Sequence, residues 1–223
     1  MSTSFTPREQ RIVAQLRTPY QVQSYLNRLP YNYERSGGSL RSFRSVVRHG
    51  SAHCLEAALF AATVLECHGY PPLVISFESV DKLDHVIFVY RAGERWGSIA
   101  RSRDPGLHGR RPVFVSPRAL AASYMDTYVD FTGRVKAFAI VNLADQMGGY
   151  DWRFSTRNVW KVEQMLIDYP HNDLRMSNAR YKWLLTRYRA FRAANDDCKP
   201  VRYYAGREKW MPLPSDSGWE RTA

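Results

Sequence analysis

The chain has 223 residues, of which 44% are hydrophobic and 24% are charged, and its net charge is +11. This length allows one sizeable core with elaborations and is short for two independent domains. The first thirty residues contain no apolar run of signal-peptide type, and no stretch of about eighteen uninterrupted apolar residues occurs anywhere. We therefore expect a cytoplasmic protein that does not cross a membrane.

The positive charge is mostly arginine, and it is scattered along the chain rather than gathered into one run. Such a balance permits an anionic partner without identifying one. The three cysteines, Cys54, Cys67 and Cys198, have spacings that match neither a disulfide framework nor a paired zinc motif. We expect free thiols in a reducing compartment, and no cofactor.

The N-terminal third of the chain shows a helical pattern that ends in the clearest helix of the sequence. Residues 6–29 predict one or two short helices that break near Pro19, and a loop follows around residues 37–38. From residue 52 to residue 68 apolar side chains recur at helical spacing, with Ser51 placed to cap the start and Gly69 to end the helix.

Strand-like segments follow this helix. Residues 73–77, 84–90 and 96–102 predict strands, and the last two are joined by a turn at Gly93 and Glu94. Beyond them the pattern predicts a helix at 117–124, a strand at 135–141, helices at 156–169 and 177–195, and a wrapping tail after Pro200. The predicted fold class is α+β, with a catalytic core at residues 1–145 and a helical C-terminal extension at residues 146–223 that packs on the core.

Cys54 is the first candidate for chemistry, because it lies in the first turn of the predicted 52–68 helix. Unpaired backbone N–H groups and the positive end of the helix dipole stabilise a thiolate there, which suits a nucleophile. The alternative is an inert buried cysteine, as is common in helices. Cys67, at the far end of the same helix, fits that alternative.

His85 is the second candidate, because an imidazole in a strand of Val, Ile, Phe and Tyr needs a hydrogen-bond partner. A two-residue turn at Gly93 and Glu94 pairs residues whose numbers sum to 187, which places Ser102 opposite His85 and Asp104 diagonal to it. Cys54, His85 and Asp104 could then act as nucleophile, base and orienting carboxylate in acyl transfer.

Three segments carry a family resemblance, namely SAHCLEAALFAATVLECHGYPPLVIS, DHVIFVY and RWGSIARSRDPG. Over about positions 50 to 106 the chain resembles the transglutaminase-like superfamily, whose papain-related core packs a cysteine-bearing helix on an antiparallel sheet. The resemblance implies the same three roles for Cys54, His85 and Asp104. In the family the aspartate follows the tryptophan more closely than Asp104 follows Trp96, so Ser102 is a rival for the third role.

The resemblance also implies an oxyanion hole made by the backbone N–H of Cys54 and a second donor from upstream. Ser51, His53 and His49 are candidates for this donor, and the sequence does not rank them. A metal site formed by His49, His53 and Cys54 is the competing interpretation. Adjacent residues rarely converge on one ion, and no second pair of ligands follows at zinc spacing, so we expect no metal.

Arginines flank both candidate regions, with Arg41, Arg44 and Arg48 before the helix and Arg101, Arg103, Arg110 and Arg111 around Asp104. They could recognise a substrate carboxylate or phosphate, or could form a solvated rim. We assign Arg101, Arg103, Ser102, Ser51 and His53 to substrate binding.

The sequence therefore predicts a cysteine-dependent enzyme that hydrolyses or transamidates a peptide, protein or small amide through a thioester, and the arginines would suit an anionic substrate. The alternative is a non-catalytic module of the same fold that binds a peptide or a nucleic acid. Aromatic and basic residues are interleaved in the C-terminal third, which could allow base stacking. At helical spacing such aromatics more often belong to a core, and no known nucleic-acid-binding pattern is present, so a nucleic-acid partner is not expected.

Overall fold

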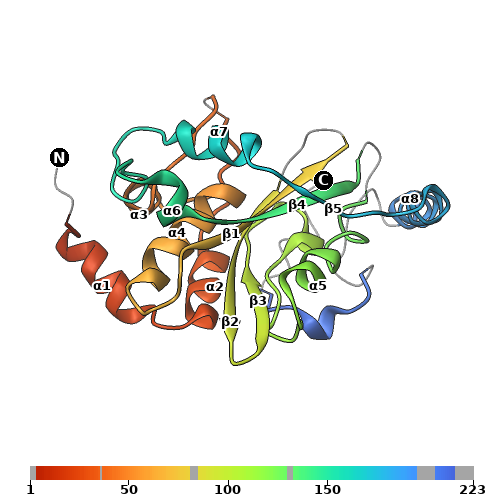
Figure 1. Cartoon of the computed structure of the whole chain (residues 1–223), viewed down its shortest axis with the longest axis horizontal. Helices are drawn as coiled ribbons and strands as arrows, with labels where there is room; N and C mark the ends of the chain where they lie inside the picture. The colour runs from red at the N-terminus through yellow and green to blue at the C-terminus, as the bar shows by residue number, and fades with distance from the viewer. Residues whose placement is uncertain (1–3, 36, 81–84, 130–132, 195–203, 214–223) are drawn as a thin grey trace.

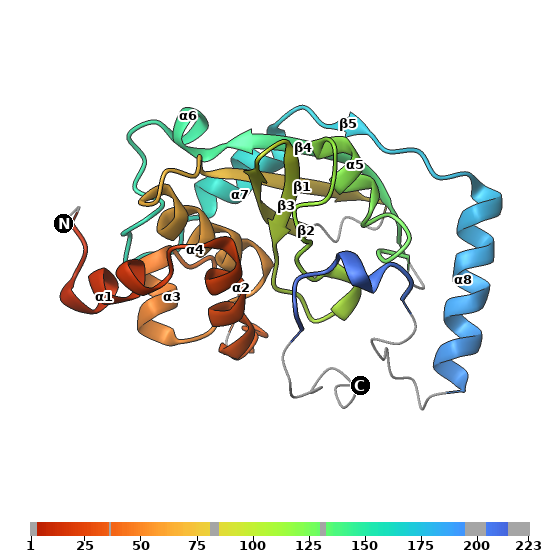
Figure 2. The same cartoon turned by 90° about the horizontal axis from the view of Figure 1, so that it is seen from below.

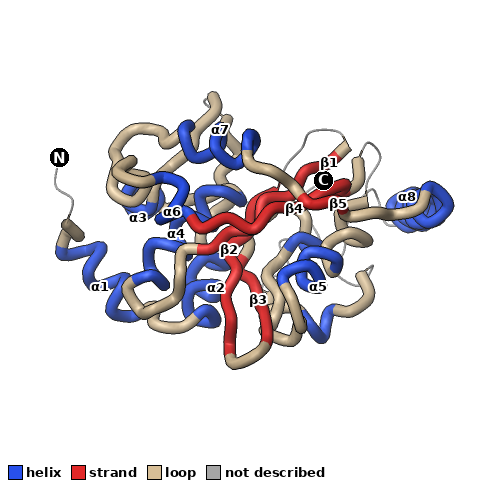
Figure 3. Tube along the Cα trace, viewed as in Figure 1, coloured by secondary structure: helices blue, strands red, loops and turns tan. Residues whose placement is uncertain are grey.

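The computed structural model describes residues 4–35, 37–80, 85–129, 133–194 and 204–213. The predicted positions Asp84, Asn195, Cys198 and Tyr203 lie outside these residues. A five-stranded antiparallel sheet with strand order β3-β2-β1-β4-β5 crosses the centre of the molecule (Figures 1 and 3). Its strands are β1 (Leu73–Ser79), β2 (His85–Ala92), β3 (Arg95–Ile99), β4 (Val135–Asn142) and β5 (Asn172–Asp173).

Helices cover both faces of this sheet, and a separate hydrophobic cluster fills each face. The larger cluster joins the sheet to α1 (Pro7–Gln15), α2 (Pro19–Arg28), α3 (Phe43–His49), α4 (Cys54–Glu66), α6 (Leu143–Met147) and α7 (Trp160–Asp168). The smaller cluster joins the other face to α5 (Pro117–Ala122), and α8 (Asn178–Ala193) lies at the end of the molecule far from α1 (Figures 1 and 2).

The α4 helix is central because nearly all its side chains are apolar and buried, from Leu55 to Leu65. It packs on β2 and is surrounded by α1, α2 and α3. Small alanines in α4 let these neighbours approach closely, and burial of its apolar surface is the main stabilising term for the core. The predicted α+β class, with the Cys54 helix packed on an antiparallel sheet, is confirmed.

The start of α4 differs from the prediction. His53 is its N-cap, whereas Ser51 was expected to be. Helix α3 continues to His49 and ends at Gly50, whose positive φ of 67° turns the chain. Ala52 then forms a parallel bridge with Tyr31, so residues 51–53 are extended before the helix begins.

The predicted register between β2 and β3 is confirmed, since Val89 pairs with Ser98 and Tyr90 with Gly97. The ladder stops at Ile99, earlier than predicted, because the amide side chain of Gln23 bonds both the N–H and the carbonyl of Ala100. Ser102 therefore lies beyond the paired region and does not face His85 across the ladder.

Residues beyond 146 contribute to the core as well as to its periphery. Trp152, Val159 and Val162 belong to the larger cluster. Helix α7 begins later than predicted because the N–H of Val159 donates to the Leu40 carbonyl and the side chain of Asn158 accepts from the Leu40 N–H. In α8, by contrast, only Leu184 and Tyr188 are buried. The domain boundary at 145 stays a prediction. None of the described helices has the length and apolar character that crossing a membrane requires.

Candidate active site

Cys54 is the first residue of α4, and its side chain is partly exposed and not in a disulfide. The amides in the first turn of a helix have no partners within the helix, and together with the helix dipole they present positive charge to the sulfur. The thiol can therefore be approached from solvent while the helix start favours its anion.

Two imidazoles, those of His53 and His85, lie near enough to this thiol to lower its pKa. His53 Nε2 lies 3.0 Å from the carbonyl oxygen of Ser39, and His85 Nε2 lies 3.2 Å from the carbonyl oxygen of Leu107. A carbonyl only accepts hydrogen bonds, so each Nε2 carries a proton and each Nδ1 is the nitrogen left for Cys54.

The balance of forces on the sulfur favours the thiolate. Burial raises the pKa of Cys54, but the hydrogen bonds and positive charges of His53 and His85 outweigh it and lower that pKa to about 5. Burial lowers the pKa of His53, but the hydrogen bond and charge of Cys54, with the charge of Glu56, raise it to about 9. Cys54 and His53 thus form a thiolate–imidazolium pair at neutral pH.

Glu56 anchors the nucleophile side, and sequence reasoning missed it. Its fully buried carboxylate accepts hydrogen bonds from the Asn32 side chain at 3.0 Å, the Ser39 hydroxyl at 3.1 Å, and the backbone N–H groups of Arg41 and His53 at 3.0 Å each. The carboxylate also lies 3.5 Å from His53 Nε2. It ties the helix start to the preceding loop and stabilises positive charge on His53.

On the other side of the sulfur, His85 is buried at the start of β2 and stacks on Phe77 at a centroid distance of 6.2 Å. The Asp104 carboxylate accepts hydrogen bonds from the Gly106 amide at 2.8 Å and the Tyr204 hydroxyl at 2.7 Å. It thereby caps the 3₁₀ turn η1 (Pro105–Leu107), whose last carbonyl contacts His85. Direct orientation of His85 by Asp104 stays a prediction, and Ser102 accepts from the Asp104 amide at 3.0 Å.

The C-terminal segment 204–213 packs along residues 104–111, which we call the histidine-side turn (Figure 2). The amide of Met211 donates to the Gly109 carbonyl at 2.9 Å, and the amide of Arg111 donates to the Lys209 carbonyl at 2.7 Å. Arg110 is buried between the rings of Tyr124 and Trp210 and donates to two carbonyls of the turn itself. Arg110 therefore stabilises the histidine-side turn and is not exposed on the side of the thiol that a substrate would approach.

Two of the other predicted arginines share one contact. Arg101 and Arg103 both lie over the ring of Tyr31, at 5.9 Å and 6.0 Å from its centre, and Arg101 also donates to the Leu29 carbonyl at 2.8 Å. Arg41 donates to the Ser51 hydroxyl at 2.7 Å. Ser51 thus contributes to the support of the loop before α4, and Arg101 and Arg103 stay candidates for substrate binding.

Tyr31 is a further residue that sequence reasoning missed. Burial and the negative charge of Cys54 raise the pKa of its phenol, so the hydroxyl keeps its proton. No hydrogen bond involves this hydroxyl among the residues that the structure describes, and the backbone bridge to Ala52 holds Tyr31 beside the start of α4. Also within the described chain, no three His, Cys, Asp or Glu side chains are grouped as they would be to hold a metal.

No family model matches the chain, and no curated protein matches it. Among solved structures, the fold is similar to Legionella pneumophila LapG, with a TM-score of 0.37 and 12% identity over 73% of this chain and 92% of that chain. The EGTA-treated form of Legionella pneumophila LapG gives the same TM-score and identity, over 83% of this chain and 91% of that chain. Similarity at this level assigns neither a family nor an activity to the chain.

Proposed function

We propose that the protein is a cysteine-dependent acyl-transfer enzyme acting on an amide or ester. The observation that carries this proposal is the position of Cys54, at a helix N-terminus and beside two imidazoles that lower its pKa. A buried structural cysteine has no need of such an environment, whereas a nucleophile depends on it.

In the proposed reaction, the Cys54 thiolate attacks the substrate carbonyl carbon, and a C–S bond forms as the carbonyl oxygen becomes an oxyanion. His85, protonated at Nδ1 as well as at Nε2, passes its Nδ1 proton to the leaving nitrogen or oxygen. The bond to that atom breaks as the oxyanion returns to a carbonyl, and a thioester remains. Water or an amine then attacks the thioester while His85 takes its proton, and cleavage of the C–S bond restores the thiolate.

The two imidazoles are proposed to have different roles. His53 keeps its positive charge because Glu56 and the thiolate both stabilise it, so it holds the sulfur as an anion. The Nε2 of His85 contacts a neutral carbonyl rather than a carboxylate, and its Nδ1 is left for the thiol and the substrate. We accordingly place proton transfer on His85 and charge stabilisation on His53.

The oxyanion would receive one hydrogen bond from the backbone N–H of Cys54. Of the candidates for the second donor, Ser51 is engaged by Arg41, and His53 is engaged by Ser39 and Cys54. Tyr31 is held beside the start of α4 by its bridge to Ala52, and its protonated hydroxyl can donate. We therefore add Tyr31 to the candidates and favour it for this role.

The test is the rate of alkylation by iodoacetamide against pH, with mass spectrometry to locate the modified residue. Cys54 should react with an apparent pKa near 5, and the His85→Ala and His53→Gln variants should each shift that value upward. Cys67 is an internal control, because burial and the charge of Glu66 raise its pKa.

An ordinary titration of Cys54 near about 8.5 would contradict an activated thiol and favour the binding-module alternative. If the thiol is activated, a screen of amides and esters follows, with Cys54→Ala as the inactive control. Added amines would distinguish transamidation from hydrolysis, because only transamidation incorporates the amine into the product.

A further inference from the structure

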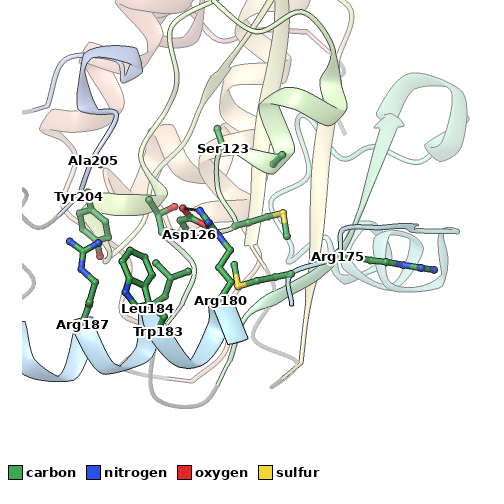
Figure 4. A pocket seen from close by; sticks show the side chains of 13 residues that line it. Ser123, Asp126, Arg175, Arg180, Trp183, Leu184, Arg187, Tyr204 and Ala205 are labelled. Atoms are coloured by element: carbon green, nitrogen blue, oxygen red, sulfur yellow. Dashed lines mark hydrogen bonds and ion pairs between the residues drawn. The ribbon is translucent and has the colours of Figure 1, made fainter. Parts of the chain in front are cut away.

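A cavity lies between the end of α5, helix α8 and the C-terminal segment, and Cys54 is not among the residues that line it (Figure 4). Its volume is about 520 Å³, within the range of roughly 300 to 1,000 Å³ that holds small organic ligands. Its walls combine apolar side chains with three arginines. The residues used below are Met125, Asp126, Arg175, Arg180, Trp183, Arg187 and Tyr204.

The three arginines are neutralised to different degrees. Arg180 forms a two-pronged pair with Asp126, with its Nε 3.1 Å from Oδ1. Arg175 pairs with Asp173 at 3.0 Å, but both side chains are largely exposed, and such pairs are weak. Arg187 has no carboxylate partner among the described residues. The cavity therefore keeps an excess of positive charge, centred on Arg187.

Aromatic side chains lie beside this charge. The Arg187 guanidinium is 4.6 Å from the centre of the Trp183 ring, and Trp183 is 53% exposed, which is unusual for so large an apolar side chain. In Figure 4, Arg187, Trp183 and Tyr204 lie together at one end of the cavity, whereas Arg175 extends from the opposite end. Met125 adds an adaptable apolar contact to the wall.

We propose that this cavity binds a small organic anion in which a carboxylate or phosphate is carried on an aromatic ring. The anionic group pairs with Arg187, whose planar guanidinium can make two parallel hydrogen bonds. The ring packs against Trp183 and the apolar wall, which buries aromatic surface that is now exposed. Neither Arg187 nor the aromatic wall is expected to bind a ligand tightly by itself, so the ligand needs both the anionic group and the ring.

Tyr204 connects the cavity to the histidine-side turn. Its hydroxyl donates to Asp104 at 2.7 Å, and its ring packs so closely on Gly106 that a Cβ there would lie 2.8 Å from it. A ligand that presses on Tyr204 moves the turn that presents the Leu107 carbonyl to His85. This part of the inference rests on the proposed function, whereas the binding itself does not.

Calorimetric titration of the full chain with phenyl phosphate tests the site. The Arg187→Gln and Trp183→Ala variants should each weaken binding by about tenfold, because one removes the charge-assisted hydrogen bonds and the other removes the stacking surface. Lys182→Gln is the matched control, since it removes the same charge from the same helix at an exposed position that does not line the cavity, and it should leave the affinity within about twofold. Phenol and inorganic phosphate should each bind more weakly than phenyl phosphate.

Absence of phenyl phosphate binding to the unaltered protein would overturn the proposal. Equal weakening by Arg187→Gln and Lys182→Gln would overturn it too, because it would indicate a diffuse attraction to a basic helix. The connection to the turn is measured as the Cys54 alkylation rate with and without phenyl phosphate, with a change of at least about twofold expected that disappears in Arg187→Gln. An unchanged rate despite measured binding would disprove the connection alone, and an unactivated Cys54 would disprove the proposed function while the titration still decides the site.

Discussion

The two sides of the Cys54 thiol are built in different ways. On the nucleophile side, the contacts of His53 and Glu56 come from residues 32–56, one continuous stretch that includes the start of α4. On the histidine side, His85 contacts the histidine-side turn. Tyr204 and Trp210, about a hundred residues further along the chain than this turn, hold it in place. The first side is local and built on a buried charge, and the second is assembled from distant segments.

This difference predicts where the molecule is rigid. Helix α4 belongs to the larger hydrophobic cluster, so disrupting the nucleophile side should lower the stability of the whole fold. The histidine-side turn packs on the C-terminal segment through a few hydrogen bonds and rings, so disrupting it should open that region alone. Each of the following changes tests one part of this contrast.

The largest effect is expected for Glu56→Ala. The substitution leaves four donors without their buried acceptor, and we expect the free energy of unfolding to fall by about 3–5 kcal/mol, as for breaking a buried charge network. Urea unfolding followed by circular dichroism measures it. Glu66→Ala is the matched control at the other end of α4, where a partly exposed pair with Arg153 should contribute only about 1 kcal/mol. Equal losses would contradict a special role for Glu56.

Trp210→Ala tests the histidine side. Removing a buried indole typically costs about 3 kcal/mol or more, but here we expect most of the loss to appear as local opening of residues 104–111. Hydrogen exchange read by mass spectrometry should show faster exchange in that turn, while α4 keeps its protection. The half-exposed Trp160 offers the control substitution Trp160→Ala. Loss of protection in α4 and in the turn together would show that the two sides unfold as one unit.

The same contrast explains what the sequence could predict. The place of Cys54 at the start of a helix could be predicted because helical periodicity and a helix start are local patterns, and the β2–β3 register could be predicted from a two-residue turn. Tyr204 and the Leu107 carbonyl have no local signal, since only the tertiary fold brings them to Asp104 and His85. Glu56 did have a signal, because an acidic residue three positions after an N-cap is the pattern of a capping box. The pattern is hard to recognise in this sequence because histidine, here His53, is an uncommon N-cap residue.

The next effect is the dependence of the unfolding free energy on pH. The pKa of Cys54 is lowered to about 5, so the stability that its thiolate contributes is lost as the pH falls through about 5. The pKa of His53 is raised to about 9, so the stability from its imidazolium is lost as the pH rises through about 9. Unfolding free energies should therefore decline on both sides of this window, and Cys54→Ser should flatten the profile.

The His53→Gln variant distinguishes the roles of the two imidazoles in the alkylation experiment. It removes one hydrogen bond and one positive charge from the sulfur, so the pKa of Cys54 should rise. A rise from about 5 to about 7 would slow alkylation at pH 6 by about tenfold, because the thiolate fraction falls from roughly nine-tenths to roughly one-tenth. His85→Ala should also slow alkylation, but it alone should abolish proton transfer in turnover. If His53→Gln stopped turnover at every pH while His85→Ala spared it, the roles assigned to the two side chains would have to be exchanged.

The smallest effect is expected at the rim. Arg103 lies over Tyr31 near the thiol, so Arg103→Gln should raise KM for an anionic substrate by about two- to threefold, with kcat little changed and the difference shrinking at high salt. Arg101 lies over the same ring but also donates to the Leu29 carbonyl, so Arg101→Gln should lower stability more than it changes KM. Steady-state kinetics at two ionic strengths, paired with urea unfolding of both variants, decide between the two. If Arg101→Gln raised KM as much as Arg103→Gln without loss of stability, both arginines would face the substrate. The hydrogen bond from Arg101 to Leu29, at the end of α2, would then contribute little to the stability of the fold.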